Sequence, residues 1–261
     1  MNNLNKFKGT RWYKCDLHLH TTASKCFQDR GVTAEQWVNK AIEQRLDCVA
    51  VTDHNTGAGI DDIQKAANGK PLVIFPGVEI TCDTSKIHLL VLFDVNKTCK
   101  DIEDFLSRCE IPREKFGEQD AYTIKNIFDV VSIANSMRGL VIPAHIDEYN
   151  GLEDCSYDII KRFFELEEII AVQVVHKPFL NSSLSIAGNG ALSQYFQEYY
   201  GKAIDENSIK KWYAPVKSVL KYDRAVLTFS DNPHEPHNSR HGLAGIGSRF
   251  TWIKMDDNPT L

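Results

Sequence analysis

Two histidines, His18 and His20, are separated by a single residue and follow Asp16 at the end of an apolar run. Alternate side chains of a β-strand point to the same face, so these three polar side chains would share one face. Two imidazoles on one face can bind one metal ion or two adjacent ions. The first chemistry that the sequence indicates is therefore metal binding.

The same pattern recurs along the chain, because five later apolar runs carry His, Asp or Glu at one end. The candidate metal ligands in these runs are His54, Glu79, His88, His145 and Asp231. Any one of them alone is more simply a hydrogen-bonded histidine, a helix cap or a solvated charge. Together they argue for cations, because burying so many ionisable groups without them would be very costly. Nitrogen and oxygen ligands of this kind suit Zn, Mn or Fe.

Two further polar residues are candidates for catalytic roles. Asp53 precedes His54 and is expected to orient a neighbouring ligand. His176 follows the apolar run 170–175, where it would either contact substrate or cap the strand.

Composition limits the class of protein. The chain has 261 residues, of which 43% are hydrophobic and 25% charged, as in globular proteins, and the formal net charge of −5 excludes a strongly basic surface overall. Its seven cysteines are an odd number without paired C-x-x-C spacing, which favours a reduced, intracellular protein. No run approaches the roughly 20 apolar residues of a membrane helix, so we expect a cytoplasmic protein with no membrane partner.

Strand and helix signals alternate along the chain, which favours an α/β fold with a mainly parallel sheet. About seven strands favour a closed or distorted barrel, in which the chemistry lies at the carboxyl ends of the strands. Strands are expected at 14–20, 48–53, 72–79, 88–93, 140–145, 170–175 and 225–230, with another at 251–255. Helices are expected at 33–45, 60–67, 100–108, 121–137, 157–167, 192–200 and 208–220.

Two local patterns are more specific. Thr33 and Gln36 have the spacing of a capping box at the start of a helix. The link between Glu79 and His88 is too short for a parallel crossover, so we predict an antiparallel hairpin with these two residues opposite each other.

The motifs resemble those of the PHP (polymerase and histidinol phosphatase) family. The resemblance rests on Asp16–His20, Thr52–His54, Gly77–Glu79, His88–Leu90 and Pro143–His145, together with Ser230-Asp231. It implies a distorted (β/α)7 barrel of the PHP type, with a two- or three-metal site that hydrolyses phosphoesters. It also implies a first metal held by His18, His20, Glu79 and Asp231, a second held by Glu79, His88 and His145, and a third that includes His54.

The sequence departs from the family pattern in two places. Where the family has Asp or His shortly after H-x-H, this chain has Cys26, either a thiolate ligand or a free thiol. The histidine of the closing Asp-x-His is displaced, and His234 is the first candidate to replace it, before His237 and His241.

The segments Gly9–Trp12 and Arg249–Asp256 resemble a narrower group, in which a PHP domain precedes an SMC-like or AAA-like ATPase domain. Residues 1–261 are therefore expected to be one PHP domain, either alone or as the N-terminal part of a chain with an ATPase domain in cis. The resemblance implies a nucleic-acid or nucleotide substrate.

The leading functional hypothesis is a metal-dependent phosphoesterase, first a nuclease or phosphodiesterase and second a phosphomonoesterase. The metal ions would activate a water molecule that attacks phosphorus. Two alternatives stay open, a metal-dependent amidohydrolase and a non-catalytic, metal-stabilised module of an ATPase.

Overall fold

The computed structural model describes residues 11–83, 85–236 and 239–261, in which strands and helices alternate. The strands are β1 (Arg11–Leu19), β2 (Cys48–Val51), β3 (Val73–Cys82), β4 (Ile87–Leu92), β5 (Leu140–Pro143), β6 (Ala171–Gln173), β7 (Ala225–Leu227) and β8 (Thr251–Met255). The α-helices are α1 (Ala34–Glu43), α2 (Ile60–Ala67), α3 (Cys99–Arg108), α4 (Ile127–Ser136), α5 (Tyr157–Phe164), α6 (Gly190–Tyr200) and α7 (Glu206–Val219). Three short 3-10 helices are η1 (Arg113–Lys115), η2 (Lys177–Leu180) and η3 (Leu243–Gly245).

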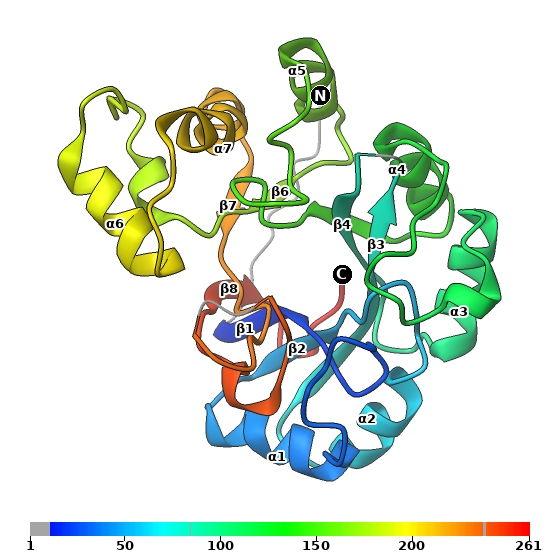
Figure 1. Ribbon diagram of the computed structural model, residues 1–261. Coiled ribbons are helices and arrows are strands. Elements are labelled where there is room, and N and C mark those ends of the chain that lie inside the picture. The colour runs from blue at the N-terminus through cyan, green and yellow to red at the C-terminus, as the bar shows by residue number, and fades with distance from the viewer. Residues whose placement is uncertain (1–10, 84, 237–238) are drawn as a thin grey trace.

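The strands form a curved six-stranded sheet in the order β5-β4-β3-β2-β1-β8 and a separate two-stranded parallel sheet of β6 and β7. Helices α1 to α4 lie along the outside of the curved sheet, and α6 and α7 lie on the side of β6 and β7 (Figure 1). Strands β1, β2 and β3 are parallel neighbours, and β2 and β3 are almost wholly buried, which is why they are rich in Val, Ile and other apolar residues.

The sequence predicts a closed or distorted barrel of seven strands, and the described residues form a curled sheet in which a full (β/α)7 barrel is not confirmed. The six-stranded and two-stranded sheets share no ladder, and β8 adds an antiparallel edge strand beside β1. Single backbone hydrogen bonds cross the gaps, from Ile146 N–H to the Gln173 carbonyl (3.0 Å) and from Asp231 N–H to the His18 carbonyl (3.0 Å). The α/β class is as expected, and the sheet is curled rather than closed.

The predicted hairpin is present, with β3 and β4 antiparallel, but its register differs by two residues from the expected one. His88 pairs with Thr81, and Glu79 pairs with Leu90. A shift of two residues keeps each side chain on its own face of the sheet, so Glu79 and His88 still point to the same side.

Helix α1 begins as the sequence indicated. The Thr33 side chain accepts a hydrogen bond from Gln36 N–H (3.2 Å), and Gln36 Oε1 accepts one from Thr33 N–H (2.9 Å). The buried face of this helix presents Trp37, whose indole N–H donates to the carbonyl of His20 (3.0 Å). The helix is thereby fastened to the loop that follows β1.

Over the part of the chain that the structure describes, none of the helices has the length and apolar character needed to cross a bilayer.

Candidate metal centre

Seven of the candidate ligands lie on strands or directly after them. His18, Glu79 and His88 are strand residues, and His20, His54, His145 and Asp231 lie one to four residues beyond a strand end. Two of these loop residues have left-handed backbones, His145 with φ 27° and Asp231 with φ 55°. Such conformations are uncommon for residues other than glycine and are found where the surrounding structure requires them.

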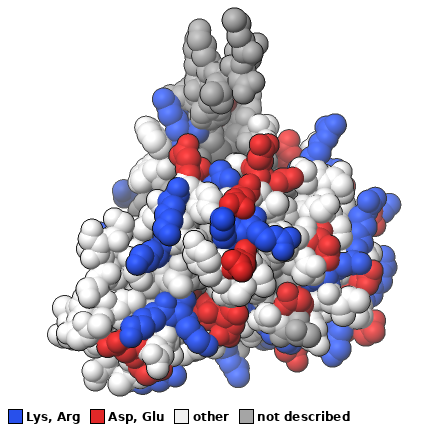
Figure 2. Space-filling view, turned by 90° about the horizontal axis from the view of Figure 1, so that it is seen from above, with Lys and Arg blue, Asp and Glu red and all other residues white. Residues whose placement is uncertain are grey.

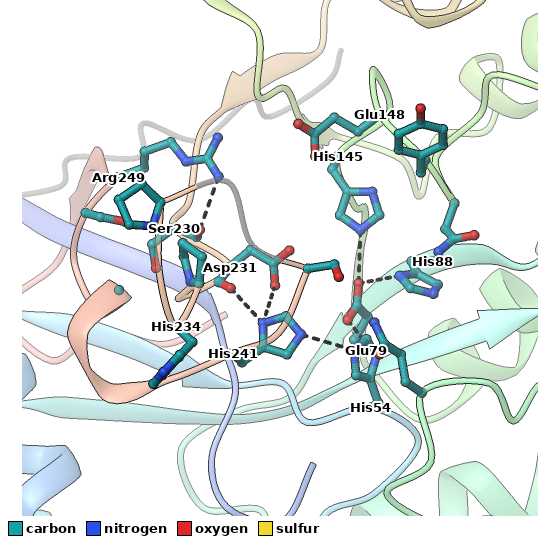
Figure 3. A pocket seen from close by; sticks show the side chains of 18 of the residues that line it. His54, Glu79, His88, His145, Glu148, Ser230, Asp231, His234, His241 and Arg249 are labelled. Carbon is teal, nitrogen blue, oxygen red and sulfur yellow. Dashed lines mark hydrogen bonds and ion pairs between the residues drawn. The ribbon is translucent and has the colours of Figure 1, made fainter. Parts of the chain in front are cut away.

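The structure brings the candidate ligands together in three overlapping groups. In each group the ligand atoms all lie within 4.8 Å of one another. The groups are His18, His20, Glu79 and Asp231; His54, Glu79 and His88; and His20, His54 and His241. His145 joins them through Nε2, which is 3.2 Å from Glu79 Oε1. Glu79 belongs to two of the three groups, and Figure 3 shows its contacts with His88 and His145.

Hydrogen bonds behind three of the histidines fix which ring nitrogen carries the proton. The Nδ1–H of His18 donates to Gln173 Oε1 (2.8 Å), and that of His241 donates to the carbonyl of Asp231 (2.9 Å). His20 Nδ1 is 3.1 Å from Ser24 Oγ, whose own proton goes to Asp53. In each ring Nε2 is left to offer a lone pair toward the centre, as in metal-ligating histidines.

The polar atoms at the centre fit metal ions better than they fit one another. Nε2 of His18 and His20 lie 3.3 Å apart, as do Nε2 of His54 and His241. His54 Nδ1 and Glu79 Oε2 are 2.9 Å apart but make no hydrogen bond, and the buried Nδ1 of His88 also lacks one within the described residues. Buried lone pairs that face each other are costly unless a cation lies between them. The donor set suits Zn, Mn or Fe.

Both carboxylates of the centre are ionised. Burial raises the pKa of Glu79, but the surrounding histidines, His88 and His18 foremost, outweigh burial and hold it well below the usual range. The pKa of Asp231 is likewise far below its ordinary value, because His18 and His241 outweigh its burial. The same two carboxylates raise the pKa of His18 to about 9 against the opposing effect of burial, so Nε2 of this ring would exchange a proton for a cation when metal binds. Two carboxylates among histidines thus form a site suited to cations.

The carboxylate of Asp53 accepts several hydrogen bonds, and Asp53 does not line the cavity. It accepts from the N–H and hydroxyl of Thr21 (2.7 and 2.6 Å) and from the N–H and hydroxyl of Ser24 (3.1 and 2.7 Å). Through Ser24 it reaches His20, so the geometry matches the role of orienting a neighbouring ligand. Direct contact with substrate is not open to this fully buried side chain.

His176 is also fully buried, among the aromatic side chains of α6 and α7. Its Nδ1 is 3.2 Å from Tyr195 Oη, and its Nε2 is 3.2 Å from both Tyr200 Oη and Glu148 Oε1. Of the two expected roles, contact with substrate or a cap on the strand, the geometry disfavours the first, because His176 does not line the cavity whereas its partners Glu148 and Tyr200 do.

The structure does not bring Cys26 or His234 into the three groups. Burial, together with the charges of Asp53 and Asp231, raises the pKa of the Cys26 thiol, which disfavours a thiolate. His234 Nδ1 lies 3.5 Å from Asp29 Oδ1, at the edge of the cavity. The expected preference for His234 over His241 is thus reversed, since His241 lies between Asp231 and His54 (Figure 3). His237 falls outside the described residues.

Sequence reasoning did not single out several residues that complete the site. Ser24, Gln173 and Asn232 are polar and fully buried, and each follows or ends a strand close to a ligand. Asn232 Oδ1 accepts from His20 N–H (2.6 Å), and its amide nitrogen donates to the His20 carbonyl (3.1 Å). Asn232 directly follows the candidate ligand Asp231 in the sequence, whereas Ser24 and Gln173 have no such local signal.

A cavity of about 560 Å³ opens over this centre. The candidate ligands His54, Glu79, His88, His145, Asp231 and His241 line it, together with Glu148, Tyr149, Tyr199, Tyr200 and Arg249. Arg249 donates to the carbonyl of Ser230 (3.2 Å) and to Tyr199 Oη (3.3 Å). No carboxylate forms an ion pair with Arg249 among the described residues. A guanidinium with spare donors therefore lies beside the metal centre (Figure 3).

This curled α/β fold carries a histidine- and carboxylate-rich centre, and the PHP domain family matches residues 16–230. The chain belongs to the PHP domain family.

Known proteins of similar sequence are exoribonucleases. The chain is 36% identical over 106 residues to the 5'-3' exoribonuclease Rnm of Salmonella typhimurium, an alignment that covers 39% of this chain and 34% of the relative. It is 40% identical over 81 residues to the 5'-3' exoribonuclease Rnm of Escherichia coli, over 30% of this chain and 26% of the relative. The alignments thus span about a third of these relatives or less.

Two solved structures share the fold at 15% identity. A lesion-specific endonuclease of Pyrococcus furiosus aligns with a TM-score of 0.58 over 93% of this chain and 52% of its own. A protein of Bifidobacterium adolescentis assigned to the metal-dependent phosphoesterases aligns with a TM-score of 0.52 over 93% and 92%.

Proposed function

We propose that this chain is a metal-dependent phosphodiesterase of the nuclease type that uses two or three Mn, Zn or Fe ions. The observation that carries the proposal is the set of three overlapping ligand groups around Glu79, with imidazole lone pairs turned toward one another. Bound divalent ions would activate water for attack on phosphorus and neutralise charge on the phosphoryl oxygens.

The proposed ligands follow the three groups in the structure. His18, His20, Glu79 and Asp231 would hold one ion, with a second at Glu79, His88 and His145 and a third at His20, His54 and His241. This assignment adds His241 and leaves out Cys26 and His234.

Arg249 is proposed to bind the phosphate. Its guanidinium lines the same cavity as the ligands and has no ion-pair partner among the residues described. A guanidinium matches the geometry of two phosphate oxygens and keeps its charge at any physiological pH. It would hold non-bridging oxygens while the phosphorus lies over the metal centre.

The substrate is proposed to be the end of a single-stranded RNA, as the names of the relatives suggest. The cavity volume is within the range of small-ligand sites, which fits one or two nucleotides rather than a duplex. Tyr149 is 54% exposed at the mouth and offers a ring on which a base can stack. Basic and acidic side chains are intermixed on the face shown in Figure 2, so phosphate recognition would be local to the cavity.

The test is hydrolysis by metal-loaded protein. Wild-type chain supplied with Mn²⁺ is expected to cleave both bis(p-nitrophenyl) phosphate and a short 5′-phosphorylated oligoribonucleotide. His20→Ala should abolish both activities, because His20 belongs to two of the three ligand groups. A matched control is Lys202→Ala, an exposed lysine in the loop after α6.

The alternative functions give different results in the same assay. Cleavage of amides but not phosphate esters would indicate an amidohydrolase, and cleavage of monoesters alone a phosphomonoesterase. Binding of one ion or none with no hydrolysis would indicate a non-catalytic module. The ATPase domain in cis stays a prediction from the sequence resemblance.

A further inference from the structure

Glu148 is a carboxylate in the wall of the cavity that belongs to none of the three ligand groups. It lies in a tight turn after the ligand His145, closed by a hydrogen bond from Glu148 N–H to the His145 carbonyl (3.0 Å). The Cα atoms at the two ends of such a turn are within about 7 Å of each other. Its side chain is 21% exposed, so the carboxylate is largely withdrawn from water yet faces the cavity beside the metal centre.

The carboxylate is held in place from behind by a rigid group of buried side chains. Its Oε1 accepts a hydrogen bond from Tyr200 Oη (2.9 Å) and lies 3.2 Å from His176 Nε2. The rings of Phe196 and Trp212 enclose His176, with centroids 4.7 and 6.2 Å from its own. Both of these contacts engage Oε1.

The carboxylate of Glu148 is an acceptor of hydrogen bonds. A carboxylate beside a phosphate site repels the phosphate itself, so its partner on the substrate would be a neutral hydrogen-bond donor. A neutral hydroxyl is such a donor, and the sugar is the part of a nucleotide joined directly to its phosphate.

We propose that Glu148 accepts a hydrogen bond from the ribose 2′-hydroxyl of the nucleotide whose phosphate lies at the metal centre, and thereby makes the site prefer ribonucleotides. The inference rests on the proposed function, since it assumes a nucleotide in this cavity. Tyr200 and His176 are positioning residues that act through Glu148. A 2′-deoxy substrate would leave this partly buried carboxylate without a hydrogen-bond partner. The site would therefore bind the deoxy substrate more weakly than the ribonucleotide.

The first experiment measures binding, not turnover. The affinities of adenosine 5′-monophosphate and its 2′-deoxy analogue are compared by titration calorimetry on Mn²⁺-loaded protein. The wild type should prefer the ribonucleotide by roughly 10- to 100-fold, the range of a hydrogen bond to a charged group. Glu148→Gln keeps the shape and removes the charge, and should bring the two affinities to within about threefold by weakening the ribonucleotide alone.

Tyr200→Phe tests the positioning. It removes the hydroxyl that holds Oε1 and leaves the aromatic packing, so it should reduce the ribose preference severalfold. A structural role alone would leave the ratio of the two affinities unchanged. Glu167→Gln, at an exposed glutamate, is the control and should retain the wild-type ratio.

Hydrolysis separates this inference from the proposed function. The ratio of oligoribonucleotide to oligodeoxyribonucleotide cleavage should fall in Glu148→Gln and stay at the wild-type value in Glu167→Gln. Cleavage of bis(p-nitrophenyl) phosphate, which has no sugar, reports the chemistry alone and should be unaffected by Glu167→Gln. A wild type with no ribose preference, or a Glu148→Gln protein that keeps it, overturns this inference and leaves the proposed function standing. Loss of sugar-free phosphodiester cleavage in Glu148→Gln would also overturn it, because Glu148 would then serve the chemistry itself. A wild type that cleaves no phosphodiester overturns the proposed function, and the binding ratio still decides the role of Glu148.

Discussion

The acceptors behind the histidines determine what the centre can bind. Asp53 holds the hydroxyl of Ser24, Ser24 accepts from His20 Nδ1, and Gln173 accepts from His18 Nδ1. Each chain of contacts points one imidazole nitrogen at the centre and fixes its tautomer. Partners of this kind typically change metal affinity by about 10- to 100-fold when they are removed.

Ser24→Ala should weaken metal binding without removing a ligand. The substitution leaves the His20 Nδ1–H without its acceptor, and we expect affinity to fall by about 10- to 100-fold. Competition with a chromophoric chelator measures it. Ser183→Ala, in an exposed loop, should bind metal as the wild type does, and equal affinities for all three proteins would contradict this role of Ser24.

His241 and His234 should differ in their effect on metal content. His241→Ala removes a member of one ligand group and should lose at least one equivalent of metal per chain. His234→Ala removes a side chain near Asp29 and should retain the wild-type content. Elemental analysis after gel filtration compares them, and the reverse result would restore the assignment made from sequence.

The sequence indicated most members of the cluster because each lies in or just after an apolar run, where a local pattern suffices. It did not rank His241 first, because the choice among three histidines depends on the path of the loop between Asp231 and Gly242. Hydrogen bonds from His234 N–H to the Arg240 carbonyl and from Gly242 N–H to the Asn232 carbonyl close that loop and turn His241 inward. No short-range signal in the sequence encodes this path.

At the scale of elements, the antiparallel hairpin explains how one carboxylate reaches several groups. Glu79 lies within β3, and β4 returns beside it, so that His88 near the start of β4 comes within 2.8 Å of Glu79 Oε1. The hairpin followed from the short link in the sequence. The register of the hairpin could not be predicted, because the expected and the observed pairings place every side chain on the same face of the sheet. The two pairings differ only in where the turn begins.

Helix α1 should depend on its cap. Thr33→Ala removes the oxygen that accepts from Gln36 N–H, and the free energy of unfolding should fall by about 1 kcal/mol. Thr33→Ser retains that oxygen and should lose much less. Urea denaturation measures both, and equal losses in the two variants would show that the methyl group, not the cap, stabilises the helix.

At the scale of the molecule, the centre joins strands from both halves of the chain. The α/β class could be predicted from the alternation of apolar runs and helical patterns. The degree to which the barrel closes could not be predicted, because it depends on whether short strands such as β6 and β7 pair with their neighbours on both sides. Each of these two strands has only three residues, too few to specify that pairing.

Metal should therefore stabilise the whole fold. Ions that bind only the folded chain add about 2.7 kcal/mol to the free energy of unfolding at a free concentration 100 times the dissociation constant. Denaturation with and without Mn²⁺ should show this increment in the wild type and little of it in Glu79→Gln, which alters the shared ligand. An equal increment in both proteins would place the stabilising ion elsewhere.

The hydrogen bond between Asp231 N–H and the His18 carbonyl has a consequence for biosynthesis. The ribosome makes His18 and His20 more than two hundred residues before Asp231, so the growing polypeptide carries exposed imidazoles long before their last partner emerges. Ion capture by the complete set of donors would consequently be a late event, reached only when translation has passed β7 and His241.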